Sequence, residues 1–183
     1  MTLPLYRRLL GPTFDALPPR VRELHDLTAP ATWRGRADVE RGTSLVARLM
    51  AIMLSLPPTG RDQPLAVTFA PDSRGRETWT RTFGTKIFPS LQYERGGSLC
   101  ERVGPTTLVF TLDASRDGLA LVLTSVRVLG IPLPRLLHPR VRTLEREQDG
   151  HYRFEVESAL PLFGPLVRYS GWLEKDAGPH DSR

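Results

Sequence analysis

The chain has 183 residues, of which 40% are hydrophobic and 25% are charged, and its formal net charge is +5. A chain of this length typically forms one domain and buries roughly 70% of the surface that its unfolded form exposes. The single cysteine, Cys100, excludes an internal disulfide framework. We expect a single domain over residues 1–175 and a disordered tail over residues 176–183.

The positive charge does not favour a nucleic-acid-binding protein. The arginines that make up most of it are spread along the chain among Asp and Glu residues, whereas a nucleic-acid footprint gathers on one face. The N-terminal apolar run is broken by Arg7 and Arg8 and lacks the cleavage site of a signal peptide. The longest apolar run, residues 45–56, is interrupted by Arg48 and is shorter than the roughly 20 residues that cross a bilayer. We expect a cytoplasmic protein without a transmembrane segment.

The N-terminal region predicts two short helices. Residues 3–10 form the first, which Gly11 and Pro12 end. Proline is tolerated in a first helical turn, so Pro18 and Pro19 predict the start of a second helix. Val21 and Leu24 place an apolar stripe along that helix.

A strand and a longer helix follow. Residues 33–40 alternate between small or apolar residues and charged ones, as in a strand with one face in water. Ser44 is suited to cap a helix over residues 45–54. Apolar residues cover nearly the whole circumference of that helix, which predicts that protein encloses it.

The rest of the chain predicts a long antiparallel meander. Strand-like runs occupy residues 65–69, 77–83, 87–93 and 106–112, then 119–128, 141–148, 151–158 and 166–173. Asp117-Gly118 and Asp149-Gly150 favour tight hairpin turns. The run 119–128 is apolar on both faces, which predicts the most central strand.

These elements predict an α+β, β-dominated fold with about eight or nine strands and short N-terminal helices. The sheet either curls around the buried helix 45–54 or closes into a barrel beside it, with helices capping one end. Both arrangements remove exposed sheet edges and can leave an internal apolar cavity.

The strand 77–83 carries the first candidate binding residue. Trp79, Arg81 and Phe83 share one face, and threonines occupy the other, so we expect Arg81 to point inward between two aromatic rings. An inward arginine needs a neighbouring carboxylate, backbone carbonyls or a ligand anion. We predict a site in which Arg81 meets the polar end of an apolar ligand and Trp33, Trp79, Phe83 and Tyr169 line the cavity.

The segment 130–140 is apolar, rich in proline and basic at the same time. Its three prolines exclude a central strand or a regular helix. It is either an ordered crossover over the open end of the sheet or a lid or partner-docking loop formed by Ile131, Leu133, Arg135 and His138.

No motif identifies an enzyme or a cofactor. The four histidines show no metal-ligand spacing, and neither a dinucleotide-binding glycine motif nor a phosphate-binding loop occurs. The sequence therefore predicts no cofactor and no metal, and it names no catalytic residue.

Three segments nevertheless resemble an uncharacterised bacterial family, domain of unknown function 4166, over roughly residues 17–173. They are Trp79-x-Arg81-x-Phe83, Gly130-Ile131-Pro132-Leu133-Pro134 and Leu162-Phe163-Gly164-Pro165-Leu166-Val167-x-Tyr169-x-Gly171. Members of the family are often fused behind a nicotinamide-dinucleotide-binding oxidoreductase domain, which this chain lacks. The resemblance implies an accessory, ligand-holding or partner module.

We therefore expect a binding module that holds a small apolar or amphipathic ligand, such as a lipid, inside a curved sheet. One alternative is an acid–base enzyme, an isomerase, cyclase or hydrolase, in the same cavity. Another is an interaction domain that docks an oxidoreductase partner through the loop 131–138.

Overall fold

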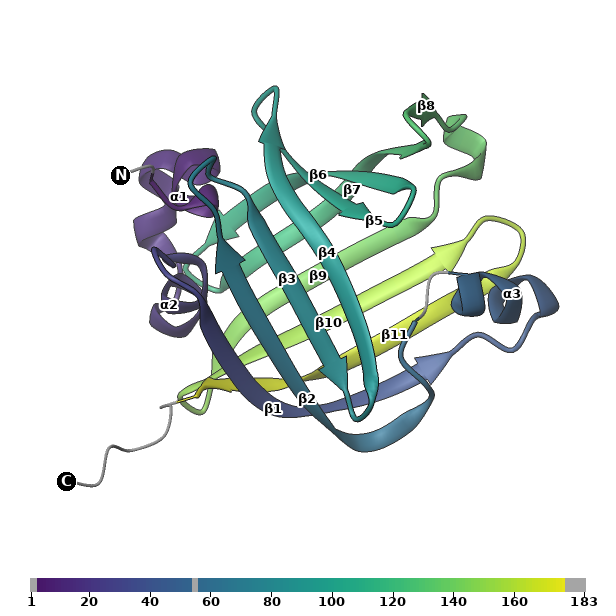
Figure 1. Ribbon diagram of the computed structural model, residues 1–183, viewed down its shortest axis with the longest axis horizontal. Helices are drawn as coiled ribbons and strands as arrows, with labels where there is room; N and C mark the ends of the chain where they lie inside the picture. The colour runs from purple at the N-terminus through teal and green to yellow at the C-terminus, as the bar shows by residue number, and fades with distance from the viewer. Residues whose placement is uncertain (1–2, 54–55, 177–183) are drawn as a thin grey trace.

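In the computed structural model, residues 3–53 and 56–176 are described, and they form a closed antiparallel barrel of ten strands (Figure 1). The strands follow one another around the barrel in chain order. The ring is complete because β1 pairs with β11 and β6 pairs with β7. The predicted β-dominated α+β fold is confirmed, in its barrel form.

The barrel strands are β1 (Ala31–Arg41), β2 (Gly60–Pro71), β3 (Glu77–Phe83), β4 (Lys86–Arg95), β5 (Ser98–Val103), β6 (Thr106–Ser115), β7 (Gly118–Val128), β9 (Arg140–Gln148), β10 (His151–Leu160) and β11 (Gly164–Lys175). The two-residue strand β8 (Ile131–Pro132) pairs only with the end of β7. The helices are α1 (Leu5–Leu10), α2 (Pro19–His25) and α3 (Leu45–Met53), with the 3-10 helices η1 (Gly11–Ala16) and η2 (Arg135–Leu137).

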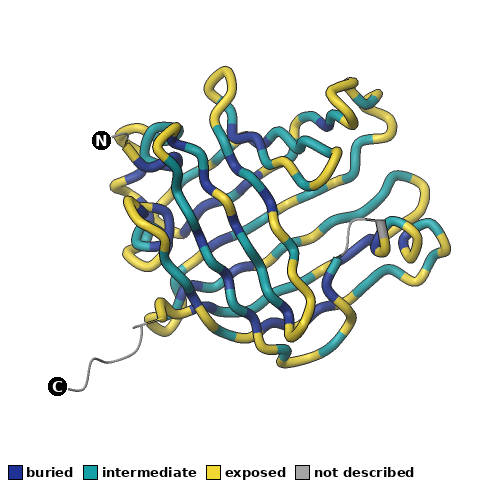
Figure 2. Tube along the Cα trace, viewed as in Figure 1, coloured by how far each residue is buried: buried dark blue, intermediate teal, exposed yellow. Residues whose placement is uncertain are grey.

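Alternation along each strand separates the inside of the barrel from the outside. In β1, Trp33, Ala37 and Val39 are buried while Arg34 and Arg36 are exposed. The same alternation of buried and exposed positions runs along the other strands (Figure 2). The amphipathic strand predicted for residues 33–40 is confirmed.

Small residues on the inner face let the barrel bend where β1 meets β11. Gly35 pairs with Leu173, and Ala37 pairs with Gly171. A Cβ atom at Gly35 would overlap the carbonyl oxygen of Trp172, and one at Gly171 would overlap that of Arg36. The two glycines therefore allow an approach between the strands that a side chain would prevent.

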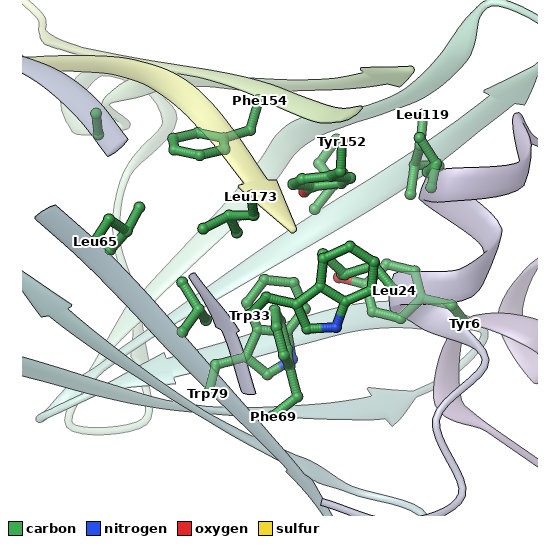
Figure 3. Packing of buried hydrophobic residues seen from close by; sticks show 14 of the residues in the cluster. Tyr6, Leu24, Trp33, Leu65, Phe69, Trp79, Leu119, Tyr152, Phe154 and Leu173 are labelled. Carbon is green, nitrogen blue, oxygen red and sulfur yellow. The ribbon is translucent and has the colours of Figure 1, made fainter. Parts of the chain in front are cut away.

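The N-terminal helices close one end of the barrel (Figure 1). Tyr6, Phe14, Val21 and Leu24 are almost completely buried and join the core of the barrel in one hydrophobic cluster. Figure 3 shows Tyr6 and Leu24 beside the inward rings of the strands, among them Trp33, Phe69 and Trp79. The helix predicted to begin at Pro18 and Pro19 is confirmed as α2.

Helix α3 lies at the opposite end, and the prediction that protein encloses it is wrong. Only one stripe of the helix faces the barrel, where Ala47 and Ala51 are buried, while Leu45, Leu49 and Ile52 are exposed. The helix packs beside β11 and β1, at the edge of the barrel's open end. Apolar residues around the whole helix therefore do not mean that the helix is buried on all sides. Leu54, the last residue of the predicted helix, lies outside the described residues.

Two predictions for the sheet also need correction. Strand β5 was missed, although Gly96-Gly97 and Gly104 mark its two ends and Leu99 and Cys100 are buried. The run 119–128 is not a central strand, because a closed barrel has no centre and Val122 points outward with 47% of its surface exposed.

Asp176, the first residue of the predicted disordered tail, is bonded to β1. Its backbone N–H donates to the carbonyl of Thr32 at 2.8 Å, and its carboxylate pairs with Arg34 at 2.5 Å. The rest of the predicted disordered tail, residues 177–183, lies outside the described residues. No helix in the described part of the chain has the length and apolar character that crossing a bilayer requires.

The close approach at Gly35 gives a prediction about stability. We expect Gly35→Ala to lower the free energy of unfolding by about 3 kcal/mol, because the new methyl group pushes β1 and β11 apart. Urea denaturation followed by circular dichroism measures the change. The control is Gly104→Ala, a turn position with open space around it, where only the positive φ costs about 1 kcal/mol. Equal losses for the two variants would contradict the argument.

Candidate functional site

The barrel encloses a cavity of about 280 Å³. Inward side chains from strands all around the barrel line it, and most of them are apolar, among them Leu65, Phe110, Leu121 and Leu173. Residues outside the barrel strands also line it, namely Met50 on α3, Pro57 just after α3, and Leu133, Leu137 and Pro139 in the β8–β9 segment. The cavity therefore reaches from the core of the barrel to the end that the N-terminal helices leave uncovered.

One ion pair interrupts the apolar wall. The guanidinium of Arg81 on β3 lies 3.1 Å from the carboxylate of Glu101 on β5, and both side chains are about one-eighth exposed at 12% and 13%. Arg81 also donates to the hydroxyl of Ser90 at 2.8 Å. Burial alone would lower the pKa of Arg81, but the Glu101 carboxylate, together with the Tyr169 and Tyr6 phenols, more than offsets this effect and the pKa is raised. The pair gives the wall a donor and an acceptor without net charge.

Aromatic rings surround this ion pair. The Arg81 guanidinium lies 5.0 Å from the ring centre of Trp79 and 5.7 Å from that of Phe88. Phe83 meets Tyr169 edge to face with 6.2 Å between ring centres. Burial raises the pKa of the Tyr169 phenol above its ordinary value, so the hydroxyl keeps its proton at neutral pH.

A second polar group lies toward the closed end. Nε2 of His25 on α2 and a carboxylate oxygen of Glu145 on β9 are 2.5 Å apart, and both side chains are almost completely buried. The His25 ring stacks on Tyr6 with 3.8 Å between ring centres. The Tyr6 hydroxyl donates to Gln92 at 2.8 Å. Of these groups, Glu145 and Gln92 line the cavity.

Glu77 is a buried carboxyl that does not line the cavity. Its side chain is 2% exposed, and it accepts a hydrogen bond from the Trp79 indole at 3.2 Å. Its other carboxylate oxygen has no hydrogen-bond partner among the described residues. Burial raises the pKa of Glu77 because the charged form loses its solvation.

Four of the five predicted ligand contacts lie at the cavity. Trp79, Arg81, Phe83 and Tyr169 line it. Trp33 is buried, but it is not part of the lining and packs edge to face against Tyr152 with 6.2 Å between ring centres. It therefore belongs to the core between the cavity and the N-terminal helices (Figure 3).

The predicted loop is divided between cavity and solvent. Leu133 lines the cavity, whereas Ile131 and Arg135 are exposed. The ring of His138 lies 2.8 Å from the carbonyl oxygen of Leu133, which holds the two ends of the loop together.

The inward-facing carboxylates Glu101 and Glu145 were not predicted from the sequence. Alternation along the strands could have identified them, because side chains two residues apart point to the same face of a strand. Glu101 shares a face with buried Leu99, and Glu145 shares one with Val141 and Thr143. His25 likewise lies next to buried Leu24 on the apolar stripe of α2.

The lumen combines apolar side chains with a few hydrogen-bonding groups. Among residues 3–53 and 56–176, no three His, Cys, Asp or Glu side chains are placed to hold a metal ion. The inward polar groups can donate and accept hydrogen bonds at two levels of an otherwise apolar lumen. An apolar molecule with one polar end has complementary chemistry.

Residues 17–173 match the model of a family described as Domain of unknown function (DUF4166). The match covers most of the chain, so the chain belongs to this family, and the resemblance drawn from its sequence is confirmed. No curated protein and no solved structure matches the chain.

The Arg81–Glu101 pair predicts a large effect on stability. We expect Glu101→Leu to lower the free energy of unfolding by about 3 kcal/mol, because it leaves the Arg81 charge inside the barrel without a partner. Chemical denaturation measures the loss, and the double variant Arg81→Met/Glu101→Leu should recover part of it. Glu157→Leu is the control, since it breaks an exposed pair with Arg168 and should cost less than about 1 kcal/mol. Similar losses for both single variants would count against the buried pair.

Glu77 predicts a pH dependence. Because its pKa is raised in the native state, the native protein keeps a proton that the unfolded chain releases above the ordinary value of 4.5. The contribution of Glu77 to stability is therefore present at low pH and is lost as the pH rises through the native pKa. We expect Glu77→Gln to raise the free energy of unfolding at neutral pH and to leave it unchanged below about pH 4. Denaturation at a series of pH values tests this. Exposed Glu155→Gln should show no such gain, and a loss of stability in Glu77→Gln at neutral pH would refute the prediction.

Proposed function

For this member of the DUF4166 family, we propose that the barrel binds one small apolar or amphipathic molecule in its cavity. The observation that carries the proposal is a mostly apolar lumen that the N-terminal helices close at one end and that reaches the other. A core that served stability alone would fill this space with its own side chains, since protein interiors are close-packed.

The size of the cavity limits the ligand. A volume of about 280 Å³ lies near the lower end of the roughly 300–1,000 Å³ typical of small-molecule pockets. Inside such a lumen a hydrocarbon chain gains the free energy of leaving water along its whole length, about 0.8 kcal/mol per methylene group. We therefore propose a single-chain lipid or a molecule of similar size.

The polar end of the ligand would meet Arg81, beside Trp79, Phe83 and Tyr169. Because Glu101 already neutralises Arg81 at 3.1 Å, a ligand carboxylate would have to displace it or leave one negative charge in excess. A hydroxyl or an amide with an N–H group can accept a hydrogen bond from Arg81 and donate one to Glu101 without that cost. We therefore propose a neutral polar end in preference to an anionic one.

An acid–base enzyme in the same cavity is a second candidate. It is favoured by the inward carboxylates Glu101 and Glu145, which both line the lumen. Against it, each already has a partner, and Glu77, the carboxyl whose pKa is raised, lies outside the lining. Acid–base chemistry needs a group of suitable pKa within reach of the substrate, so binding is the better supported function.

The interaction domain for an oxidoreductase partner stays a prediction. Exposed side chains of the loop, such as Ile131 and Arg135, are compatible with docking. They do not indicate which kind of protein would bind.

Filling the cavity tests the proposed function. Val156 on β10 lines the lumen and is not fully buried, so Val156→Trp should occupy ligand space and reduce binding about tenfold or more. Native mass spectrometry with fatty alcohols and fatty acids of matched chain length measures binding, and the alcohols should bind more tightly. Glu155→Trp is the matched control, because its side chain points outward from the same strand.

Three outcomes are informative. Binding that survives in Val156→Trp, or that is equally lost in Glu155→Trp, would refute a ligand inside the barrel. Stronger capture of the fatty acids would refute the role given to the neutral Arg81–Glu101 pair. Recovery of a chemically altered ligand would favour the enzyme instead.

A further inference from the structure

The open end of the barrel carries an apolar rim. Exposed large hydrophobic side chains occur on α3, at the start of β4, in the segment from the end of β7 to η2, and in the β10–β11 turn. They are Leu45, Leu49, Ile52, Ile87, Val128, Leu129, Ile131, Leu136, Leu137, Leu162 and Phe163. Among the described residues, the remaining exposed large hydrophobics are Leu3 and Val122.

The topology places these segments together. In an up-and-down barrel successive connections alternate between the two ends, so the β1–β2, β3–β4, β5–β6, β7–β9 and β10–β11 connections share one end. Figure 1 shows α3 and β8 projecting from this end, away from α1 and α2. Figure 2 colours Ile131–Pro132 and several residues of α3 as exposed. The apolar side chains therefore surround the mouth of the cavity, where Leu137 and Met50 enter its lining.

The connections at this end carry charge of one sign, although exposed Glu40 and Asp62 lie near the ends of the adjoining strands β1 and β2. The connections at this end, residues 42–53, 56–59, 84–85, 104–105, 129–139 and 161–163, contain no Asp or Glu. Arg48 and Arg135 lie within them, and Lys86 and Arg140 lie at the first positions of the adjoining strands; all four are exposed.

The opposite end differs in charge. Its turns contain Asp72, Asp117 and Asp149, and the N-terminal helices that cover it carry Asp15 and Glu23. The chain as a whole mixes both signs, so the absence of carboxylates from the rim is a property of one end of the barrel.

We propose that the apolar, cationic rim of the barrel docks on the surface of a membrane that contains anionic lipids. Apolar side chains next to basic ones are the combination that binds the interface of such a membrane, where the former enter the acyl boundary and the latter meet the head groups. The inference rests on the proposed function, which gives a reason for docking. When the mouth of the cavity lies against a membrane, an apolar ligand can pass between membrane and cavity without crossing water.

The rim fits a membrane better than it fits a second copy of the chain. Two copies that met rim to rim would bring Arg48, Lys86, Arg135 and Arg140 of one against the same cations of the other, and the connections that form the rim contain no carboxylate to compensate them. The apolar side chains also come from separate connections around a mouth, which suits a fluid surface that adapts to each of them.

Vesicle sedimentation with the full chain tests the proposal. The protein should bind vesicles of phosphatidylcholine mixed with phosphatidylserine and should bind vesicles of phosphatidylcholine alone more weakly. Leu49→Gln/Leu136→Gln, one change on each side of the mouth, should reduce partitioning about tenfold or more. The matched control is Leu3→Gln/Val122→Gln, which alters the exposed hydrophobics outside the rim and should bind like the unmodified protein.

The basic residues give a second readout. Replacing Arg48 or Arg135 by glutamine should each lower partitioning to the mixed vesicles about fivefold and weaken its dependence on salt. Arg116→Gln, in a turn at the opposite end, should have no effect. Because Arg48, Arg135 and Arg116 are all exposed, circular dichroism should show that each variant keeps the fold.

The proposal is overturned if the protein binds neither kind of vesicle, or if the rim variants and their controls lose binding equally. It is also overturned if light scattering shows a dimer that Leu49→Gln/Leu136→Gln dissociates, because the rim would then be an interface between copies. Failure of the proposed function looks different. If ligand capture does not depend on the cavity while vesicle binding still depends on the rim, the proposed function fails and the docking proposal holds. If ligand capture depends on the cavity but the protein does not bind vesicles, the docking proposal fails and the proposed function holds.

Discussion

Closure of the β-sheet is the constraint on which the rest of this structure depends. The ring needs β1 to hydrogen bond to β11 and β6 to β7, and the first of these contacts needs Gly35 and Gly171, whose Cβ atoms would overlap the opposing backbone. Once the ring is closed, every barrel strand pairs with a neighbour on each side, and every second side chain on each strand is turned into one shared interior. The cavity follows from this geometry.

Closure also explains why inward polar groups occur in pairs. A charged or polar side chain that points into the barrel loses its contact with water and must find a partner inside. Arg81 finds Glu101 on another strand, and Glu145 finds His25 on the helix that covers the closed end. These partners are far apart in the sequence. The pairs that satisfy the buried polar groups therefore also link one strand to another and an N-terminal helix to a strand.

The two ends of the barrel perform different tasks because the meander sorts its connections between them. At one end, α1, η1 and α2 bury their apolar side chains in the core and seal the lumen. At the other, α3 and the segment around η2 turn apolar side chains both into the mouth and outward. An apolar lumen that opens within an apolar and cationic rim unites the proposed ligand and the proposed membrane surface in one path.

The sequence by itself determined the local structure and which side chains of a strand share a face. Alternation placed Trp79, Arg81 and Phe83 on an inward face, two Asp-Gly pairs marked hairpin turns, and Pro19 marked the start of α2, because these features depend on nearest neighbours along the chain. Only the tertiary structure decided that α3 lies at the rim, that Trp33 lies outside the cavity lining, and that Glu101 and His25 serve as buried partners. An apolar surface has the same composition whether it faces a core, a cavity or a membrane, and the partner of an inward charge depends on which strands the closed ring brings together.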